Sequence, residues 1–314
     1  MTRFDPEVPG RRENEVNLSA RPLFPHVVID QSALRDEQLV REALVRARHQ
    51  DRLILLPDVA LLEMVKAKNW ELMFRRNLRL LGEYPAGVVA GRGLGELMRE
   101  EVKSVVSVEE IVDHEITGDL RRLLQNLKVG AGPTLDEFRA NYEAVKREVI
   151  DSRLNHMKNK KTLAAYQDSV GSGLKEEQIE ALKAGDDALL QGLLASDNTT
   201  RFIGNHLSMT QDWPILHSWC LARVDSFSAH FSLCRTATSF LWAGRPELQG
   251  MAAKKATNEM LDGEYIVLAS KCEGFLTRDK GAKRIYEAVR AAADERWARL
   301  VSEAWEDESD SVEG

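Results

Sequence analysis

The chain has 314 residues, of which 43% are hydrophobic and 30% are charged, which suits one large domain or a core that carries an insertion. The formal net charge is −7, but the last twelve residues hold six acids and no base. The rest of the chain therefore carries about −1, and its charge does not exclude a nucleic-acid partner. Three cysteines without a CxxC pair, a polar N-terminus and the lack of an apolar run of about 18 residues argue against a disulfide-stabilised secreted protein and a membrane-spanning one. We expect a cytoplasmic protein.

The first third of the chain alternates short apolar runs with stretches of helical spacing. Residues 1–22 are polar and lack periodicity, so we expect a flexible arm there. Strands are expected at 26–29, 52–56 and 87–91, and helices at 33–48 and 58–82. This alternation predicts right-handed βαβ units and therefore a parallel sheet.

The pattern changes near residue 94, because no convincing strand follows for roughly 150 residues. Helices are expected there at 108–128, 134–167, 174–183, 186–195 and within 214–242. A helix at 251–270, a strand at 275–277, a closing helix at 282–305 and a disordered acidic tail at 306–314 complete the chain. We therefore predict an α/β fold whose core, residues 23–95 plus 250–305, is interrupted by an all-helical insertion at 96–249.

Four carboxylates, far apart in sequence, are expected at one edge of the predicted sheet. Asp30 and Asp279 follow strands, Glu63 lies early in the helix after the second strand, and Asp262 lies in the helix before the last strand. Sites in open parallel sheets form beyond the carboxyl ends of the strands. Four ionised acids at one site need a counter-charge, which Mg²⁺ or Mn²⁺ supplies while activating a water. Asp30 and Asp279 could each instead cap a helix, and Glu63 could face solvent and interact with the helix dipole. Glu259 or Glu264 could replace Asp262.

The sequence around these acids resembles the four acidic motifs of the PIN domain nucleases, at 29–32, 56–63, 262–269 and 274–279. The resemblance implies a three-layer α/β/α core with a parallel sheet, and metal-dependent cleavage of RNA. It implies that the catalytic and metal-binding residues are Asp30, Glu63, Asp262 and Asp279, with Ser32 and Thr277 orienting metal or phosphate. By analogy, it suggests a toxin or defence role with an inhibitory protein partner. The chain departs from the family in its enlarged middle helices and in lacking a clear strand after Asp279.

Basic side chains on two predicted helices are candidates for phosphate contacts. They are Arg75, Arg76 and Arg79 on the helix of Glu63, and Arg147, Lys158, Lys160 and Lys161 in the basic stretch 139–161. The alternative is that they form solvated helix faces. The spacing of His217, Cys220, His230 and Cys234 is compatible with zinc, but the apolar residues around them favour a buried helical core.

Three functions agree with these features. The first is a metal-dependent endoribonuclease that holds Mg²⁺ or Mn²⁺ at the four acids, with the helical insertion selecting substrate or docking a partner. The second is a PIN-like scaffold without catalysis, whose insertion binds RNA or protein. The third is a nuclease that acts on DNA. The sequence leaves a homo-oligomer open.

Overall fold

The computed structural model describes residues 20–101, 109–127, 132–171, 173–210, 225–243 and 251–310. Within them, four parallel strands form one sheet in the order β3-β2-β1-β4. The strands are β1 (Phe24–Ile29), β2 (Leu53–Leu56), β3 (Val88–Ala90) and β4 (Cys272–Leu276). The register aligns Ile29 with Leu276, and Leu56 with Ala90, so the carboxyl ends of the strands meet at one edge. The predicted α/β class and parallel sheet are confirmed.

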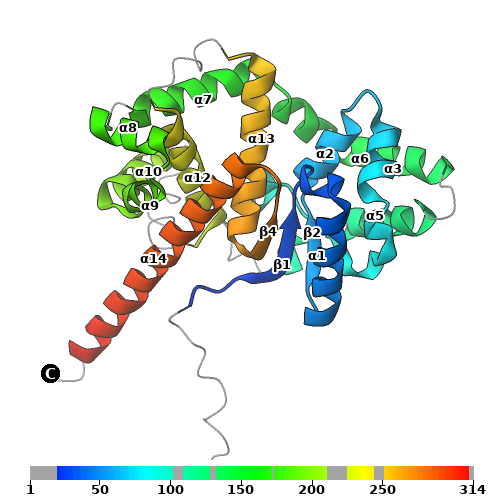
Figure 1. The fold of residues 1–314 in the computed structure, drawn as a ribbon, viewed down its shortest axis with the longest axis horizontal. Coiled ribbons are helices and arrows are strands. Elements are labelled where there is room, and N and C mark those ends of the chain that lie inside the picture. Colours follow the sequence, from blue (N-terminus) through cyan, green and yellow to red (C-terminus); the bar gives the residue numbers. More distant parts are fainter. Residues whose placement is uncertain are drawn as a thin grey trace, which may run out of the picture.

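Helices make up most of the described chain (Figure 1). They are α1 (Glu37–Gln50), α2 (Asp58–Val65), α3 (Trp70–Leu78), α4 (Leu94–Glu100), α5 (His114–Leu127), α6 (Gly132–Arg153), α7 (His156–Gly171), α8 (Glu176–Ala184), α9 (Asp187–Ala195), α10 (Asp197–Thr210), α12 (Phe227–Trp242), α13 (Ala253–Ser270) and α14 (Lys280–Asp310). Short 3-10 turns lie at η1 (Ala33–Arg35), η2 (Leu81–Glu83), η3 (Pro85–Gly87) and η4 (Glu109–Ile111). None of the described helices is both long and apolar enough to span a membrane.

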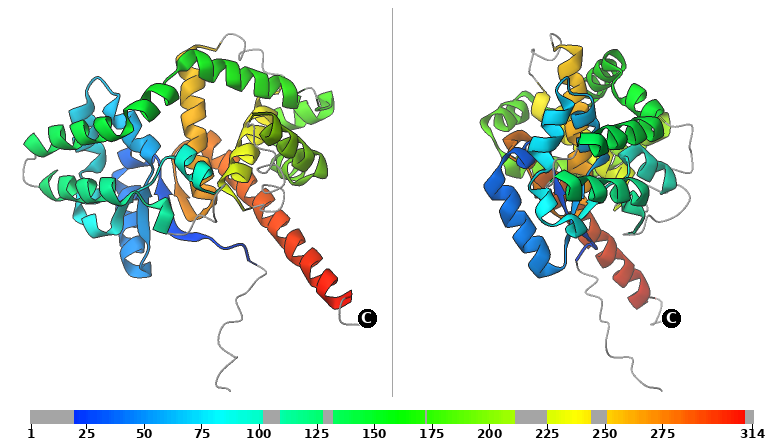
Figure 2. Two further views of the ribbon diagram at one scale, coloured as in Figure 1. Left: turned by 180° about the vertical axis from the view of Figure 1, so that it is seen from behind. Right: turned by 90° about the vertical axis from the view of Figure 1, so that its right-hand side faces the viewer.

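Helices cover both faces of the sheet, because successive strand residues point to opposite sides. Ile29, Ile54 and Leu56 pack into one core with residues of α1, α2, α3, α5 and α6. Val28 and Leu55 pack into the other with residues of α4, α7 to α10, and α12 to α14. Figures 1 and 2 show these two groups of helices on opposite sides of the sheet. The helices that follow β3 therefore extend both cores of the sheet.

Two predicted helices are each broken in two. The helix expected at 58–82 consists of α2 and α3, and the one expected at 134–167 consists of α6 and α7. Val65 and Phe74 would point to opposite sides of one unbroken helix of about 3.6 residues per turn. Both are buried in the same core, so the chain must turn between them. The need to bury both helices in this one core, and not the local helical spacing, explains the break.

The ends of the fold also differ from the prediction. Helix α14 continues to Asp310, past the predicted end at residue 305, and in Figure 1 it projects from the body. The flexible arm predicted at 1–22 is wrong at Arg21, which is 6% exposed. Its guanidinium donates hydrogen bonds to Asp294, Asp225 and the Ser270 carbonyl at 2.7–2.9 Å. The remainder of both predicted ends, 1–19 and 311–314, lies outside the described residues.

Candidate functional site

Asp30 comes directly after β1, and three hydrogen-bond donors hold its carboxylate. Its carboxylate accepts from the hydroxyls of Ser32 at 2.7 Å and Thr277 at 2.5 Å, and from the backbone N–H of Ala33 at 2.7 Å. The side chain is buried, with the whole residue 7% exposed. These donors fix the carboxylate at the sheet edge, with contacts from the loops after both β1 and β4.

The same two hydroxyls join those loops. Ser32 Oγ accepts a hydrogen bond from the Arg278 backbone N–H at 2.8 Å, and Thr277 Oγ1 accepts from that of Asp279 at 3.0 Å. Asp279 in turn accepts from the Ala282 backbone N–H at 2.9 Å, at the start of α14. Ser32 and Thr277, predicted to orient metal or phosphate, thus contact Asp30 and position the segment that carries Asp279.

Glu63 lies in the second turn of α2 and is half-buried. The hydroxyl of Tyr265, a buried residue of α13, donates to Glu63 Oε2 at 2.8 Å. Burial raises the pKa of Glu63, and the nearby charge of Asp30 raises it further, while the Tyr265 hydrogen bond and the charge of Lys66 oppose this shift. The carboxylate therefore has a fixed orientation and a reduced tendency to ionise.

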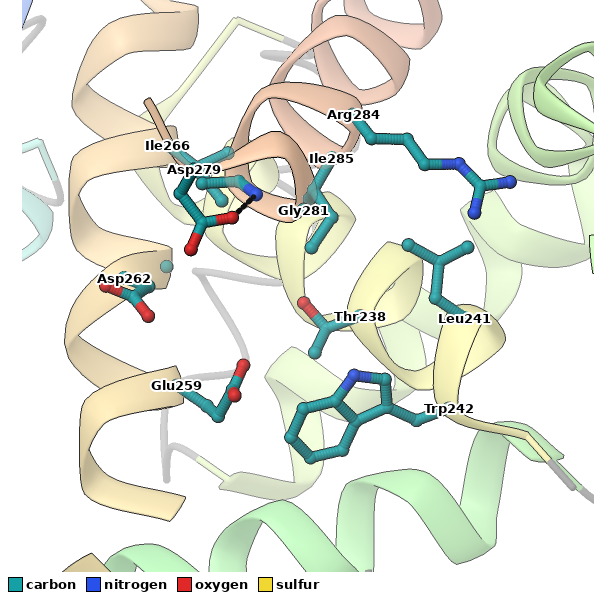
Figure 3. A pocket seen from close by; sticks show the side chains of 12 residues that line it. Thr238, Leu241, Trp242, Glu259, Asp262, Ile266, Asp279, Gly281, Arg284 and Ile285 are labelled. Atoms are coloured by element: carbon teal, nitrogen blue, oxygen red, sulfur yellow. Dashed lines mark hydrogen bonds between the residues drawn. The ribbon is translucent and has the colours of Figure 1, made fainter. Parts of the chain in front are cut away.

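Asp262 and Glu259 lie three residues apart on α13, so they share one face of the helix. With Asp279 they line a cavity of about 250 Å³, whose other wall includes Thr238 and Trp242 of α12. Figure 3 shows the three carboxylates on the same side of this cavity, with the Trp242 ring across from Glu259. Part of the predicted helical insertion thus forms a wall beside the acids.

Among the acids of this cluster, Asp262 has the most strongly raised pKa. Burial raises the pKa of its carboxyl to about 8, and the charges of Glu63, Glu259, Asp279 and Asp30 raise it in the same direction. Burial also raises the pKa of Glu259, with a further increase from Asp279. The other three predicted acids therefore lie close enough to Asp262 to affect its pKa. Glu259 does so as well, and is the fifth acid of the cluster.

Glu264, the other alternative to Asp262, belongs to a different cluster. Its carboxylate accepts from Arg153 Nη2 at 2.5 Å, and Arg153 Nη1 donates to Asp58 at 2.5 Å. Asp58 also accepts from the Tyr142 hydroxyl at 2.6 Å. This ionic cluster, Asp58–Tyr142–Arg153–Glu264, joins α6 to α2 and α13, the helices that carry Glu63 and Asp262. Sequence reasoning missed it because its members are far apart in the chain.

Positive charge near the five acids comes from residues that do not pair with them. The charge of Lys66 lowers the pKa of Glu63, and the charges of Lys255 and, more weakly, Arg235 lower the pKa of Glu259. Arg235 is 4% exposed and donates from Nη2 to the Met260 carbonyl at 3.0 Å. No ion pair between the five acids and a basic side chain is present in the described ranges. Their negative charge is therefore only partly balanced.

The chemistry of these acids fits a hard divalent cation, since Mg²⁺ and Mn²⁺ prefer carboxylate oxygens. Mutual repulsion contributes to the raised pKa of Asp262, and a dication would relieve it. Among the residues that the structure covers, no three His, Cys, Asp or Glu side chains are placed so that they could hold a metal ion as they stand. The carboxylates would therefore have to converge further in order to bind one.

Among the residues that the structure describes, none of the other predicted candidates lines the cavity beside the acids. Cys234 lies near it, since burial and the charge of Asp262 both raise the pKa of its thiol. Arg75 and Arg76 are exposed on α3, Arg79 is exposed directly after it, and Lys158, Lys160 and Lys161 lie on α7. Of the seven basic candidates, Arg147 alone lines a large groove, which is described below. His230 and Cys234 are buried in α12, where His230 Nδ1 is 2.6 Å from Ser270 Oγ. His217 and Cys220 lie outside the described residues.

Comparison of the chain with protein-family models, curated proteins and solved structures gives no match.

Proposed function

We propose that the protein is a metal-dependent nuclease that hydrolyses phosphodiester bonds at the site formed by Asp30, Glu63, Asp262, Asp279 and Glu259. The observation that carries this proposal is the convergence of unpaired acids at the carboxyl edge of a parallel sheet, beside an open cavity. Such acids typically hold Mg²⁺ or Mn²⁺, which when bound activates water and stabilises the leaving oxygen. RNA is our preferred substrate because of the sequence resemblance.

The residues around the acids support separate roles. Ser32, Thr277 and the Ala33 amide hold Asp30 in one orientation, and Tyr265 does the same for Glu63. These two acids would be the fixed ligands. The pKa of Asp262, which burial raises to about 8, favours the protonated form at neutral pH, so binding of the ion would release a proton from this carboxyl.

Cleavage of labelled single strands tests this function. The full-length protein is incubated with RNA or DNA of the same sequence, with Mn²⁺ or with chelator. We expect cleavage of RNA with Mn²⁺, and loss of that cleavage both in chelator and in Asp30→Asn, because Asp30 supplies a ligand oxygen. The control is Glu177→Gln, which removes an exposed acid of α8, and should cleave as the wild type does.

Each other result has a distinct meaning. Cleavage of DNA in preference to RNA would keep the chemistry and change the substrate. Cleavage that survives both chelator and Asp30→Asn would contradict the proposal. A third result is that neither polymer is cut, while RNA binds both to the wild type in chelator and to the Asp30→Asn variant. The protein is then a scaffold whose acids have structural roles.

A further inference from the structure

A basic groove opens next to the acids, on the side of α2, α3 and α6. It has a volume of about 490 Å³. Its charged and aromatic lining consists of Lys66, Lys68, Trp70, Arg139, Arg147, Glu143 and Asp151. Lys66 follows Glu63 by less than one turn, and its charge acts on both Glu63 and Asp262. The groove and the acid cluster are therefore neighbours.

Three of the cations in the groove form no direct ion pair within the part of the chain that the structure describes. These are Lys66, Lys68 and Arg147, and all three are exposed. Lys66 and Lys68 lie where the chain turns between α2 and α3, at the break that helical spacing did not predict. With four bases against two acids, the lining has an excess of positive charge, which suits phosphate groups.

Trp70 and Arg139 add a flat, rigid surface. The Arg139 guanidinium lies over the Trp70 ring at 4.7 Å, and Arg139 Nε donates to Glu143 at 2.7 Å. The Trp70 ring also meets the fully buried Phe74 ring edge-on, with the ring centres 6.1 Å apart. Nucleobases stack on aromatic rings and on guanidinium planes, so this pair could carry one base.

We propose that this groove binds a single-stranded nucleic acid, with backbone phosphates at Lys66, Lys68 and Arg147 and one base on the Trp70–Arg139 stack. The inference deepens the proposed function and rests on it for the direction of the strand, which would run from the groove to the acids. A nucleic acid is favoured over an acidic protein because the flat stack lies among the unpaired cations.

Binding without cleavage provides the test. A fluorescent single-stranded RNA of about twelve nucleotides is titrated with the full-length protein in chelator, over a range of salt concentrations. The triple variant Lys66→Ala, Lys68→Ala, Arg147→Ala should bind about tenfold more weakly and lower the slope of log affinity against log salt by about 2. Trp70→Leu should weaken binding about fivefold and leave that slope unchanged.

A charge-matched control is the triple variant Lys175→Ala, Lys183→Ala, Arg201→Ala, whose basic residues are exposed, lie outside the groove and are not among the predicted phosphate contacts. It should retain affinity within about twofold. Equal losses in the two triple variants, or no RNA binding by the wild type, would overturn the proposal. Polyglutamate that binds as tightly as the RNA would assign the groove to an acidic protein instead. Thermal unfolding shows whether each variant is folded. If the triple variant of the groove is unfolded, the single variants Lys68→Gln and Arg147→Gln are used in its place.

The results also separate this inference from the proposed function. RNA binding that depends on the groove, together with no cleavage under any metal condition, would retain the groove and reject the nuclease. If the protein cleaves RNA in a metal-dependent way but the groove variants bind RNA as the wild type does, the nuclease proposal holds and the groove proposal is wrong. A single-stranded DNA of the same sequence shows whether the groove distinguishes the two polymers.

Discussion

Replacing Arg153 with methionine should lower the free energy of unfolding by about 3 to 5 kcal/mol, because it leaves two buried acids without their cation. Asp58 and Glu264 each accept a 2.5 Å hydrogen bond from this guanidinium, and their side chains are 4% and 13% exposed. Burial already raises the pKa of Glu264, and the Arg153 charge is the main influence that opposes this shift. Urea unfolding at pH 7 measures the change.

Two comparisons separate the lost pairing from lost packing. Arg147→Met changes an exposed arginine of the same helix and should shift stability by less than about 0.5 kcal/mol. Adding Asp58→Asn and Glu264→Gln to Arg153→Met should recover most of the loss, since no unpaired charge then remains buried. A loss below about 1 kcal/mol in Arg153→Met, or no recovery in the triple variant, would contradict this account.

Replacing Asp262 with asparagine should stabilise the protein at pH 8 relative to the wild type. The Asp262 carboxyl ionises near pH 3.8 when unfolded and at about pH 8 when folded. Between these values the folded state holds a proton that the unfolded state has released, so wild-type stability falls as the pH rises. Asparagine resembles the protonated acid and removes this dependence. We expect the variant's advantage to grow by about 2 kcal/mol between pH 5 and pH 8, since partial exposure screens part of the full effect.

The measurement is urea unfolding of both proteins in chelator at pH 5, 6, 7 and 8. Glu177→Gln changes an exposed acid on α8 and should follow the wild type at every pH. If the curves of stability against pH for the wild type and Asp262→Asn run parallel, the acids do not repel one another in the folded protein. The site would then lack the unbalanced charge on which the proposed function rests.

The first three strands were predictable because their signals are local, whereas β4 begins at Cys272, three residues before the strand predicted at 275–277. An apolar run followed by an acid indicates a buried strand that ends in a carboxylate at the sheet edge, as for β1 and Asp30. The order of such runs gave the parallel sheet, whose carboxyl ends meet at one edge. Glu259 could have been included with Asp262, because a spacing of three residues places both on one helix face. On the sequence alone we expected only one of the two in the cluster.

The breaks between helices and the supporting contacts were not predictable in the same way. Helical spacing continues through residues 66–69, and the turn there arises because α2 and α3 must both reach one core. The Arg153 cluster and the Tyr265–Glu63 hydrogen bond join helices that are far apart in sequence. The basic groove depends on the same break, which brings Lys66, Lys68 and Trp70 opposite α6.

The central claim, that the acids share a divalent cation, is tested most directly by equilibrium binding of Mn²⁺ to the full-length protein at pH 8. We expect the wild type and Glu177→Gln to bind the ion alike, and Asp30→Asn and Asp262→Asn each to bind it at least tenfold more weakly, since each removes a charged ligand. Wild-type protein that binds no Mn²⁺, or Mn²⁺ binding that both substitutions leave unchanged, would contradict the account.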